Sequence, residues 1–419
     1  MREKLIVALL AIGIFLLASF FRLYGVNWDQ NQHLHPDERF LTMVAGAISW
    51  PRSAGEYLDA STSPLNPHNR GFGFFVYGTF PIFFTKWVAE LLDKADYNQL
   101  TIVGRQLSAI FDLGTVALVF LIAKSVIPTE LKRVEGSLAN ARSSNKLRDS
   151  STEFTLSLSN VLGMTSRTYW IFPLIAMFLY SIMVLPIQLS HFFAVDTYLT
   201  FFITLSFYLL IRIICHAEFI SASNSNTREI LRQAQDDKWK KILNSKIPHP
   251  SPLLIGEGLS VRFLYPILLG LSFGLALASK ISALLFLPII GLGIIIFFLR
   301  NRNLFMLFVL CSMFLFSSYL TFRLTQPYLF ATGNIFDITL NQKVLDNWKQ
   351  LKSFNDPKGW FPPAVQWIKT KPYIYPLKNM ILWGLGLPLG IISIASSIYI
   401  IGLLGYWVIG LFKKKQLTI

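Results

Sequence analysis

Two adjacent carboxylates, Asp37 and Glu38, follow His35 and Pro36 shortly after the first hydrophobic segment of the chain. Proline favours an extended residue before it and the start of a helix after it, so the pair is predicted to lie in the first turn of a helix at residues 37–49. There the carboxylates could simply complement the helix dipole. They could also share a polar cavity with other charged groups and take part in binding or proton transfer. The acid pair alone leaves both interpretations open.

Other ionisable residues are predicted at the same membrane face. Arg105, at the start of a hydrophobic segment, could bind a phosphate through its forked guanidinium or could extend to the membrane surface. His191 and Asp196 lie in a short joint between two apolar segments, where either could act only as a helix cap. Lys280, in another joint, could bind a lipid phosphate or serve as a turn residue. Their common depth in the membrane favours a shared polar cavity.

The composition is that of an integral membrane protein. Of the 419 residues, 53% are hydrophobic and 15% are charged, and the mean hydropathy is positive. The net charge of +15 comes from basic residues in loops between apolar segments, which indicates positive-inside topology rather than nucleic acid binding. The only cysteines, Cys215 and Cys311, lie in different hydrophobic segments, so no disulfide framework is predicted.

A bilayer core about 30 Å thick is crossed by roughly 20 helical residues. By this measure the sequence predicts an all-α polytopic membrane helix bundle that forms a single membrane-embedded domain over residues 1–419. The first segment is interpreted as a retained helix, because no small-residue cleavage site follows it. About eight transmembrane helices are predicted, near residues 5–24, 104–126, 169–189, 195–214, 263–279, 281–299, 303–322 and 386–411.

The basic clusters predict which loops face the cytoplasm. If all of them are cytoplasmic, residues 25–103 and 323–385 are extracytoplasmic. The large first loop, 25–103, is expected to carry juxtamembrane helices, and residues 72–92 are assigned to it because a further span there would invert every later loop against its charge. Residues 137–167 and 216–258 are polar cytoplasmic insertions without helical periodicity and are expected to be disordered.

The order of these residues resembles the C-type (GT-C) glycosyltransferase superfamily, in particular its protein O-mannosyltransferase-like and aminoarabinose transferase-like branches. In that superfamily an acidic residue or pair follows the first helix, as Asp37 and Glu38 do here. A proline-containing amphipathic segment comes next, to which residues 77–86 are similar. An Arg-x-x-Ser-Ala helix is matched by residues 105–109, and an outer aspartate ahead of another span is matched by Asp196. The resemblance covers most of the chain outside the insertions.

The resemblance implies an enzyme that transfers a sugar from a polyprenyl-phosphate donor to an acceptor hydroxyl of a protein, lipid or glycan. Asp37, with Glu38 beside it, would be catalytic, as the general base that deprotonates the acceptor. Arg105, with Lys280 or Lys86 as alternatives, would bind the donor phosphate. Some members bind a divalent metal through outer-loop carboxylates, which the spacing here does not require. The residues that would orient these groups or bind the acceptor are His35, His191 and Asp196.

Two other classes stay open. In a polytopic membrane transporter or lipid flippase, Asp112, Arg105 and Asp196 would form a path for protons or substrate. An inactive scaffold could also keep the fold. The sequence contains no internal repeat and no paired interrupted segments, which favours the enzyme over the transporter. We expect a multi-pass protein of the plasma (inner) membrane, in contact with membrane lipids and with its site facing outward.

Overall fold

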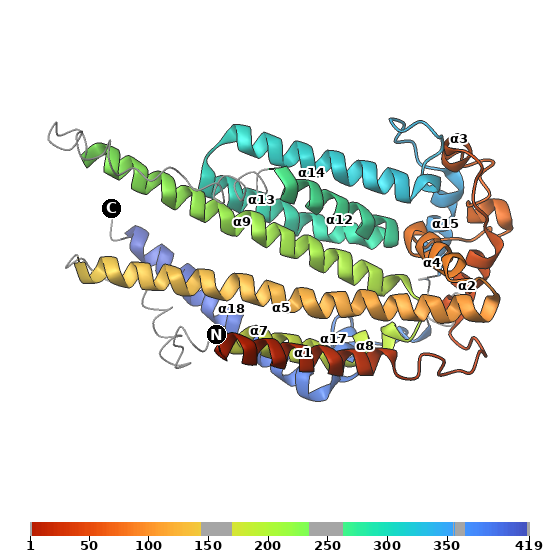
Figure 1. Cartoon of the computed structure of the whole chain (residues 1–419), viewed down its shortest axis with the longest axis horizontal. Coiled ribbons are helices and arrows are strands. Elements are labelled where there is room, and N and C mark those ends of the chain that lie inside the picture. The colour runs from red at the N-terminus through yellow and green to blue at the C-terminus, as the bar shows by residue number, and fades with distance from the viewer. Residues whose placement is uncertain (1, 144–169, 234–262, 355, 357–364, 417–419) are drawn as a thin grey trace. The chain divides into compact units, whose positions relative to one another are not determined.

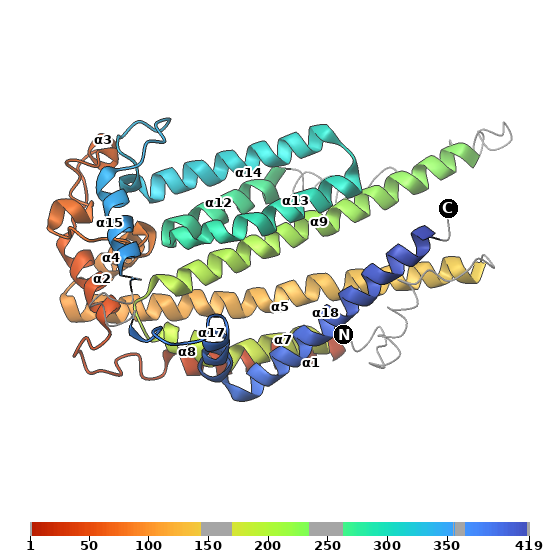
Figure 2. The same cartoon turned by 180° about the vertical axis from the view of Figure 1, so that it is seen from behind.

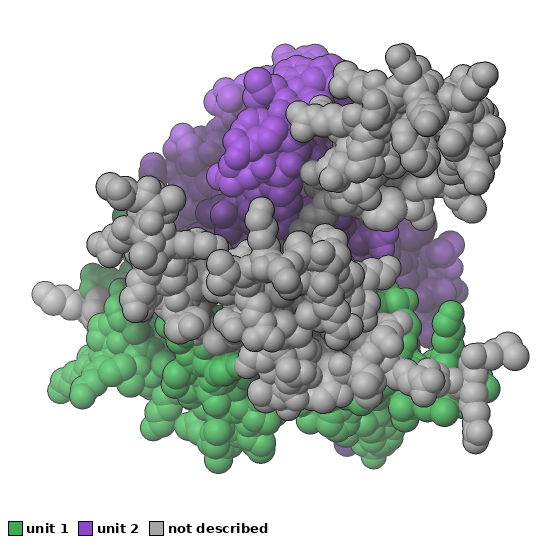
Figure 3. All heavy atoms as spheres, turned by 90° about the vertical axis from the view of Figure 1, so that its left-hand side faces the viewer, with its two compact units in different colours: residues 1–25, 119–191, 352–419 green, residues 26–118, 192–351 purple. Residues whose placement is uncertain are grey.

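The structure is a computed structural model that describes residues 2–143, 170–233, 263–354, 356 and 365–416. Within these residues the chain is all-helical, and the one strand-like feature is an isolated bridge between Phe330 and Leu340. The chain forms two compact units, coloured separately in Figure 3. The first unit comprises residues 1–25, 119–191 and 352–419, and the second comprises residues 26–118 and 192–351.

The helices follow one another in the order labelled in Figure 1. The α-helices are α1 (Arg2–Leu23), α2 (Pro36–Ala47), α3 (Ala54–Leu58), α4 (Thr79–Leu91), α5 (Tyr97–Ser143), α7 (Ile171–Ser181), α8 (Val184–Ser190), α9 (Val195–Gln233), α12 (Tyr265–Ser279), α13 (Leu287–Asn301), α14 (Leu304–Thr325), α15 (Gln342–Ser353), α17 (Ile374–Asn379) and α18 (Leu387–Gln416). The 3-10 helices are η1 (Pro67–Arg70), η3 (Ile281–Phe286) and η4 (Pro327–Leu329), and η5 (Met380–Gly386) is a π-helix.

The described helices agree with a polytopic membrane protein. The pair α7 and α8 is bent by 57° and counts as a seventh span if it crosses as one, whereas α12 is apolar but only 15 residues long. Together with six longer helices, these elements coincide with the eight predicted segments, and the predicted all-α membrane fold is confirmed. Within the described residues, the six helices long and apolar enough to cross a membrane are Lys4–Leu23, Tyr97–Val126, Val195–Cys215, Ile281–Asn301, Leu304–Thr325 and Ile374–Gly402.

Two boundaries differ from the sequence prediction. The last span begins at Ile374 rather than near residue 386, because α17, the π-helix η5 and α18 form one continuous apolar run. Residues 137–143 continue α5 and residues 216–233 continue α9, while the rest of the two polar insertions lies outside the described residues.

In the first unit, α1 packs against α7 and α8. Arg22, buried near the end of α1, donates hydrogen bonds from Nη1 to the Ser181 carbonyl at 2.9 Å and from Nη2 to the Tyr180 carbonyl at 3.4 Å. The last carbonyl groups of a helix have no hydrogen-bond donor within the helix. Arg22 therefore supplies donors to the carbonyl groups at the end of α7, where the α7–α8 pair bends.

In the second unit, α12 packs against both α9 and α14, and α13 packs against α9 (Figures 1 and 2). The α12–α14 contact is close because Gly270 has no side chain: a Cβ there would lie 2.0 Å from Ser317 Oγ. Small residues at such contacts let membrane helices approach each other. The short helices α2, α3, α4 and α15 gather at one end of this bundle, where α9 begins and where α12 and α14 end (Figure 1).

Candidate functional site

A buried ion cluster joins the start of α2, the loop before it and α5. Arg105 donates from Nε and Nη2 to the two carboxylate oxygens of Glu38 at 2.8 and 2.5 Å. It also donates from Nη1 and Nη2 to Asp29 at 3.0 and 2.8 Å, and from Nη1 to the Val26 carbonyl at 2.9 Å. A guanidinium has five N–H donors, so all of them are used here. The three charged side chains are at most 1% exposed.

The cluster holds α2 in place rather than presenting a free cation. The Phe193 backbone N–H adds a further hydrogen bond to Glu38 at 2.8 Å. Burial opposes ionisation of Asp29, but the hydrogen bonds and positive charge of Arg105 outweigh it and keep the pKa of Asp29 below its ordinary value. Because no guanidinium N–H is left over, Arg105 in this arrangement has no donor to offer a phosphate.

The first turn of α2 explains why the two adjacent carboxylates differ. The His35 ring Nδ1 accepts the Glu38 backbone N–H at 3.2 Å, and Pro36 occupies the first helical position, so the helix begins where the sequence predicts. Successive helical residues point about 100° apart. Glu38 is therefore turned inward and buried, whereas Asp37 is exposed. The His35 ring stacks on Phe192 with centroids 4.2 Å apart, which fixes the entry into the helix.

The exposed Asp37 carboxylate lies beside the Tyr77 hydroxyl. The Asp37 carboxylate is near enough for its charge and hydrogen-bonding capacity to act on the Tyr77 hydroxyl, and Asp196 is near enough for its charge to act on the same tyrosine. Burial, the charge and hydrogen bond of Asp37 and the charge of Asp196 together raise the pKa of Tyr77 above its ordinary value. The hydroxyl therefore keeps its proton and remains a hydrogen-bond donor beside Asp37.

Asp196 in turn pairs with Lys280. The distance from Lys280 Nζ to Asp196 Oδ1 is 2.7 Å, and the two side chains are 42% and 38% exposed. Asp196 lies in the first turn of α9, and Lys280 directly follows the last residue of α12. Solvent-accessible ion pairs contribute about 0–1 kcal/mol. Lys280 can therefore leave Asp196 for an anionic ligand at little cost, unlike the enclosed Arg105.

The segment after Tyr77 is docked onto the ends of two membrane helices. The Gly78 N–H donates to the Ser279 carbonyl at 3.2 Å, and a Cβ on this glycine would lie 2.3 Å from that same oxygen. The Thr79 N–H and Oγ1 both donate to Gln326 Oε1 at 2.5 Å, which caps the start of α4. These contacts hold the tyrosine next to the joint between α12 and η3, where Lys280 lies.

Two other residues predicted from the sequence lie elsewhere. Lys86, 8% exposed, pairs with Glu90 one turn along α4 at 2.9 Å. His191 belongs to the first unit, where its Nδ1 and Nε2 lie 2.8 and 2.9 Å from the carbonyl oxygens of Ile187 and Tyr24. Of the predicted site residues, those that the second unit gathers around Tyr77 are Asp37, Asp196 and Lys280, with His35, Glu38 and Arg105 forming their support.

Sequence reasoning does not identify Asp29 or Tyr77. Asp29 lies in a loop without helical or strand periodicity. Only the structure shows that Arg105 is buried, and therefore that its charge requires carboxylate partners such as Asp29. Tyr77 could have been noticed from the glycine that follows it, since a residue without a Cβ beside a polar side chain allows close backbone approach.

Among the residues that the structure describes, no group of three or more His, Cys, Asp and Glu side chains is arranged to hold a metal ion. Asp37 and Asp196 both act on the same tyrosine, but Asp196 already pairs with the Lys280 ammonium at 2.7 Å. This donor set does not fit a divalent cation, which prefers several oxygen ligands.

No family model matches the chain, and no curated protein matches it in sequence. Among solved structures, the chain is similar to the Saccharomyces cerevisiae protein O-mannosyltransferase Pmt1–Pmt2 complex bound to the sugar donor, with a TM-score of 0.43 and 14% sequence identity. The match covers 79% of this chain and 34% of the other, so this chain spans about a third of the length of the protein that it matches.

Proposed function

We propose that this protein is an integral membrane glycosyltransferase that moves a sugar from a polyprenyl-phosphate donor to an acceptor hydroxyl of a protein, lipid or glycan on the extracytoplasmic face. The observation that carries the proposal is the placement of Asp37. Its carboxylate is exposed and lies beside the Tyr77 hydroxyl, at a helix start that the buried Glu38–Arg105 pair holds in position. A fixed, accessible carboxylate is what a general base requires.

In the proposed reaction, Asp37 accepts the proton of the acceptor hydroxyl. The Tyr77 hydroxyl lies beside the carboxylate of Asp37, which still has lone pairs free to accept the proton of the acceptor hydroxyl. The acceptor oxygen forms a bond to the anomeric carbon of the donor sugar while the bond from that carbon to the phosphate oxygen breaks. The polyprenyl phosphate leaves with the bonding electrons, and the anomeric configuration inverts.

Lys280 is the residue best placed to bind the donor phosphate. Its side chain is 42% exposed, it lies at the end of a membrane helix, and its ion-pair partner within the described part of the chain is the partly exposed Asp196. Binding of the donor phosphodiester would replace that weak pair, and the ammonium would offset the additional negative charge that develops on the phosphate as it departs. Asp196 would then be free to accept a hydrogen bond from a substrate hydroxyl.

The buried cluster acts as support in this proposal. Catalytic geometry is sensitive to displacements of about 1 Å, so a base needs a rigid attachment. Arg105 ties Asp29 and Glu38 together through bonds of 2.5 to 3.0 Å, and Glu38 is the residue next to Asp37. Arg105 is therefore a positioning residue. Its sequence context suggests binding of the donor phosphate, but in this proposal Lys280 binds it.

One observation favours a transporter as a second candidate. The span formed by α7 and α8 is bent by 57°, and the π-helix η5 interrupts the last span. Broken helices in transporters supply binding sites at the membrane midplane. The Asp37 carboxylate, however, lies at the start of α2, outside the candidate spans, and it belongs to the other unit. The transporter remains an outcome of the test below.

The test is sugar transfer from a panel of radiolabelled polyprenyl-phosphate sugars in vesicles that contain the purified full chain. The variant Asp37→Asn removes the base, and Asp93→Asn is the matched control. Asp93 is an exposed aspartate with φ 55°, a conformation that asparagine also adopts. Transfer that Asp93→Asn keeps and Asp37→Asn loses supports the proposal. Flux of ions or lipids without transfer of any sugar supports the transporter instead.

A further inference from the structure

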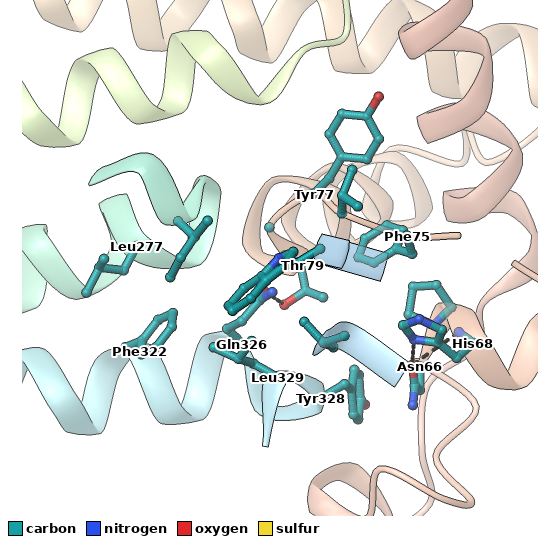
Figure 4. Close-up of a pocket in the computed structure, with 16 residues that line it drawn as sticks. Asn66, His68, Phe75, Tyr77, Thr79, Leu277, Phe322, Gln326, Tyr328 and Leu329 are labelled. Atoms are coloured by element: carbon teal, nitrogen blue, oxygen red, sulfur yellow. Dashed lines mark hydrogen bonds between the residues drawn. The ribbon is translucent and has the colours of Figure 1, made fainter. Parts of the chain in front are cut away.

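A pocket lies beside the Tyr77 segment, in the second unit (Figure 4). About 490 Å³ of unfilled space lies in and in front of it, and this figure includes open solvent. Leu277, Ile281 and Phe322, near the ends of the membrane helices, contribute apolar lining, and Gln326 and Trp348 also line the pocket. Figure 4 shows the Tyr77 hydroxyl turned away from Gln326.

The lining combines aromatic rings with uncharged polar groups. Among the described residues that surround the pocket there is no Asp, Glu, Lys or Arg, and the one titratable base is His68. Burial and the nearby charge of Lys343 lower the pKa of His68, so its ring is neutral. A charged ligand would lose its hydration here without gaining a partner of opposite charge. The pocket therefore selects against ions.

The neutral ring of His68 is part of a fixed wall. Asn347 Nδ2 lies 2.9 Å from His68 Nε2 and donates to the Phe75 carbonyl at 3.1 Å, and His68 Nδ1 faces Asn66 Oδ1 at 3.3 Å. The pattern fits a ring with its proton on Nδ1 and a lone pair on Nε2. This chain of bonds attaches α15 to the 66–75 segment and sets the position of Trp348, the next residue along α15.

Two polar donors in the wall are available to a ligand. Gln326 Oε1 is occupied by Thr79, but its Nε2 group makes no hydrogen bond to the described part of the chain. The indole N–H of Trp348, a half-buried residue, is likewise unbonded within the described residues. Both groups still reach solvent, so the hydroxyl or ring oxygen of a ligand could take the place of water bound to them.

We infer that this pocket binds an uncharged sugar ring. Such a ring has C–H faces that pack on an aromatic surface such as Trp348, and hydroxyl groups that accept from Gln326 and the indole. The identification of the ligand as a sugar rests on the proposed function, whereas its lack of charge follows from the lining. The sugar belongs either to the donor or to a glycan acceptor, and both have this chemistry.

The test is direct binding to the full chain in lipid nanodiscs, measured by saturation-transfer NMR. The probes are a neutral methyl hexopyranoside, glucuronic acid and glucosamine. The neutral probe is expected to receive saturation and the charged probes to receive little. Trp348→Ala is expected to reduce the signal about fivefold or more through loss of the stacking surface. Trp87→Ala, at a tryptophan 51% exposed on α4, is the matched control and should leave it unchanged.

Trp348→Phe keeps an aromatic ring without the N–H and is expected to give an intermediate signal even if Trp348→Ala folds poorly. Equal signals from charged and neutral sugars, or a signal that neither substitution reduces, would overturn the inference. Excess polyprenyl-phosphate sugar displaces the probe if the pocket holds the donor sugar and leaves it bound if the pocket holds an acceptor sugar. Binding does not need Asp37, so Asp37→Asn should keep the signal, and loss of transfer alone bears on the proposed function only.

Discussion

Replacement of Arg105 by methionine is expected to destabilise the protein by about 3–5 kcal/mol, the usual cost of removing one partner of a buried ion pair. Methionine fills similar space but removes five hydrogen bonds of 2.5 to 3.0 Å. It leaves the carboxylates of Asp29 and Glu38 at most 1% exposed without a cation. The unpaired charges, rather than the lost packing, dominate this estimate.

The origin of the loss can be tested by neutralising the partners. The triple variant Arg105→Met, Asp29→Asn and Glu38→Gln buries no charge, and it should recover most of the stability because uncharged replacements of buried ion pairs are often neutral or stabilising. Arg52→Met, at an exposed arginine, is the matched control and should change stability by less than about 0.5 kcal/mol.

The pH dependence gives a second signature. In the native protein the pKa of Asp29 is lowered, so its contribution to stability is present above its ordinary value of 3.8 and is lost as the pH falls through the lowered folded value. In Arg105→Met burial still raises this pKa, while of the effects that lower it only the backbone hydrogen bonds from Leu34 and Asn31 remain. The stability deficit of Arg105→Met should therefore shrink as the pH is lowered from about 8 to 5.

The assay is equilibrium unfolding of the purified variants in detergent, followed by tryptophan fluorescence as denaturant is added. A deficit in Arg105→Met below about 1 kcal/mol would refute the assignment of a buried structural cluster, as would a triple variant no more stable than the single one. Donor affinity measured on the same folded variant separates this role from phosphate binding.

Four further changes follow from the site. Tyr77→Phe is expected to lower kcat about tenfold with little change in KM, measured by steady-state transfer, and an unchanged kcat would exclude Tyr77 as a positioning residue. Lys280→Met should raise the KM for the donor about tenfold, whereas Lys280→Arg, which keeps the positive charge, should have a KM close to that of the native protein. Equal KM values for the two variants would show that Lys280 does not bind the donor phosphate. Gly78→Ala should lower the stability measured by thermal unfolding by about 1–3 kcal/mol, because the new Cβ would lie 2.3 Å or less from backbone oxygens of α12. A variant as stable as the native protein would show that the Gly78 backbone does not pack this closely against α12. Sugar binding in the uncharged pocket should weaken as the pH falls from about 7 to 5. The folded pKa of His68 lies below its ordinary value, and protonation of its Nε2 would remove the acceptor of the hydrogen bond from Asn347. Binding that does not change with pH would contradict this.

The sequence predicts the membrane helices and the start of α2 because both depend on local signals. Long apolar runs identify spans, and Pro36 before two acidic residues identifies a helix N-terminus. The gathering of Asp37, Asp196 and Lys280 also follows in part, since alternate helix ends must lie on one side of a membrane.

The different tasks of Asp37 and Glu38 could not be predicted, because nothing local says which side of α2 faces α5. The enclosure of Arg105 depends on a loop whose residues Gln30 and His33 adopt φ 51°, a conformation that the sequence does not signal. Tyr77 is likewise placed by tertiary contacts of the following residues with the ends of α12 and α14.

The central claim is that Asp37 is the base for sugar transfer. The most direct measurement is single-turnover transfer in vesicles by Asp37→Asn, together with its affinity for the same polyprenyl-phosphate sugar. The proposal predicts unchanged donor affinity and a transfer rate lower by about 100-fold or more, the usual contribution of a general base. A transfer rate within about twofold of the native protein would contradict it.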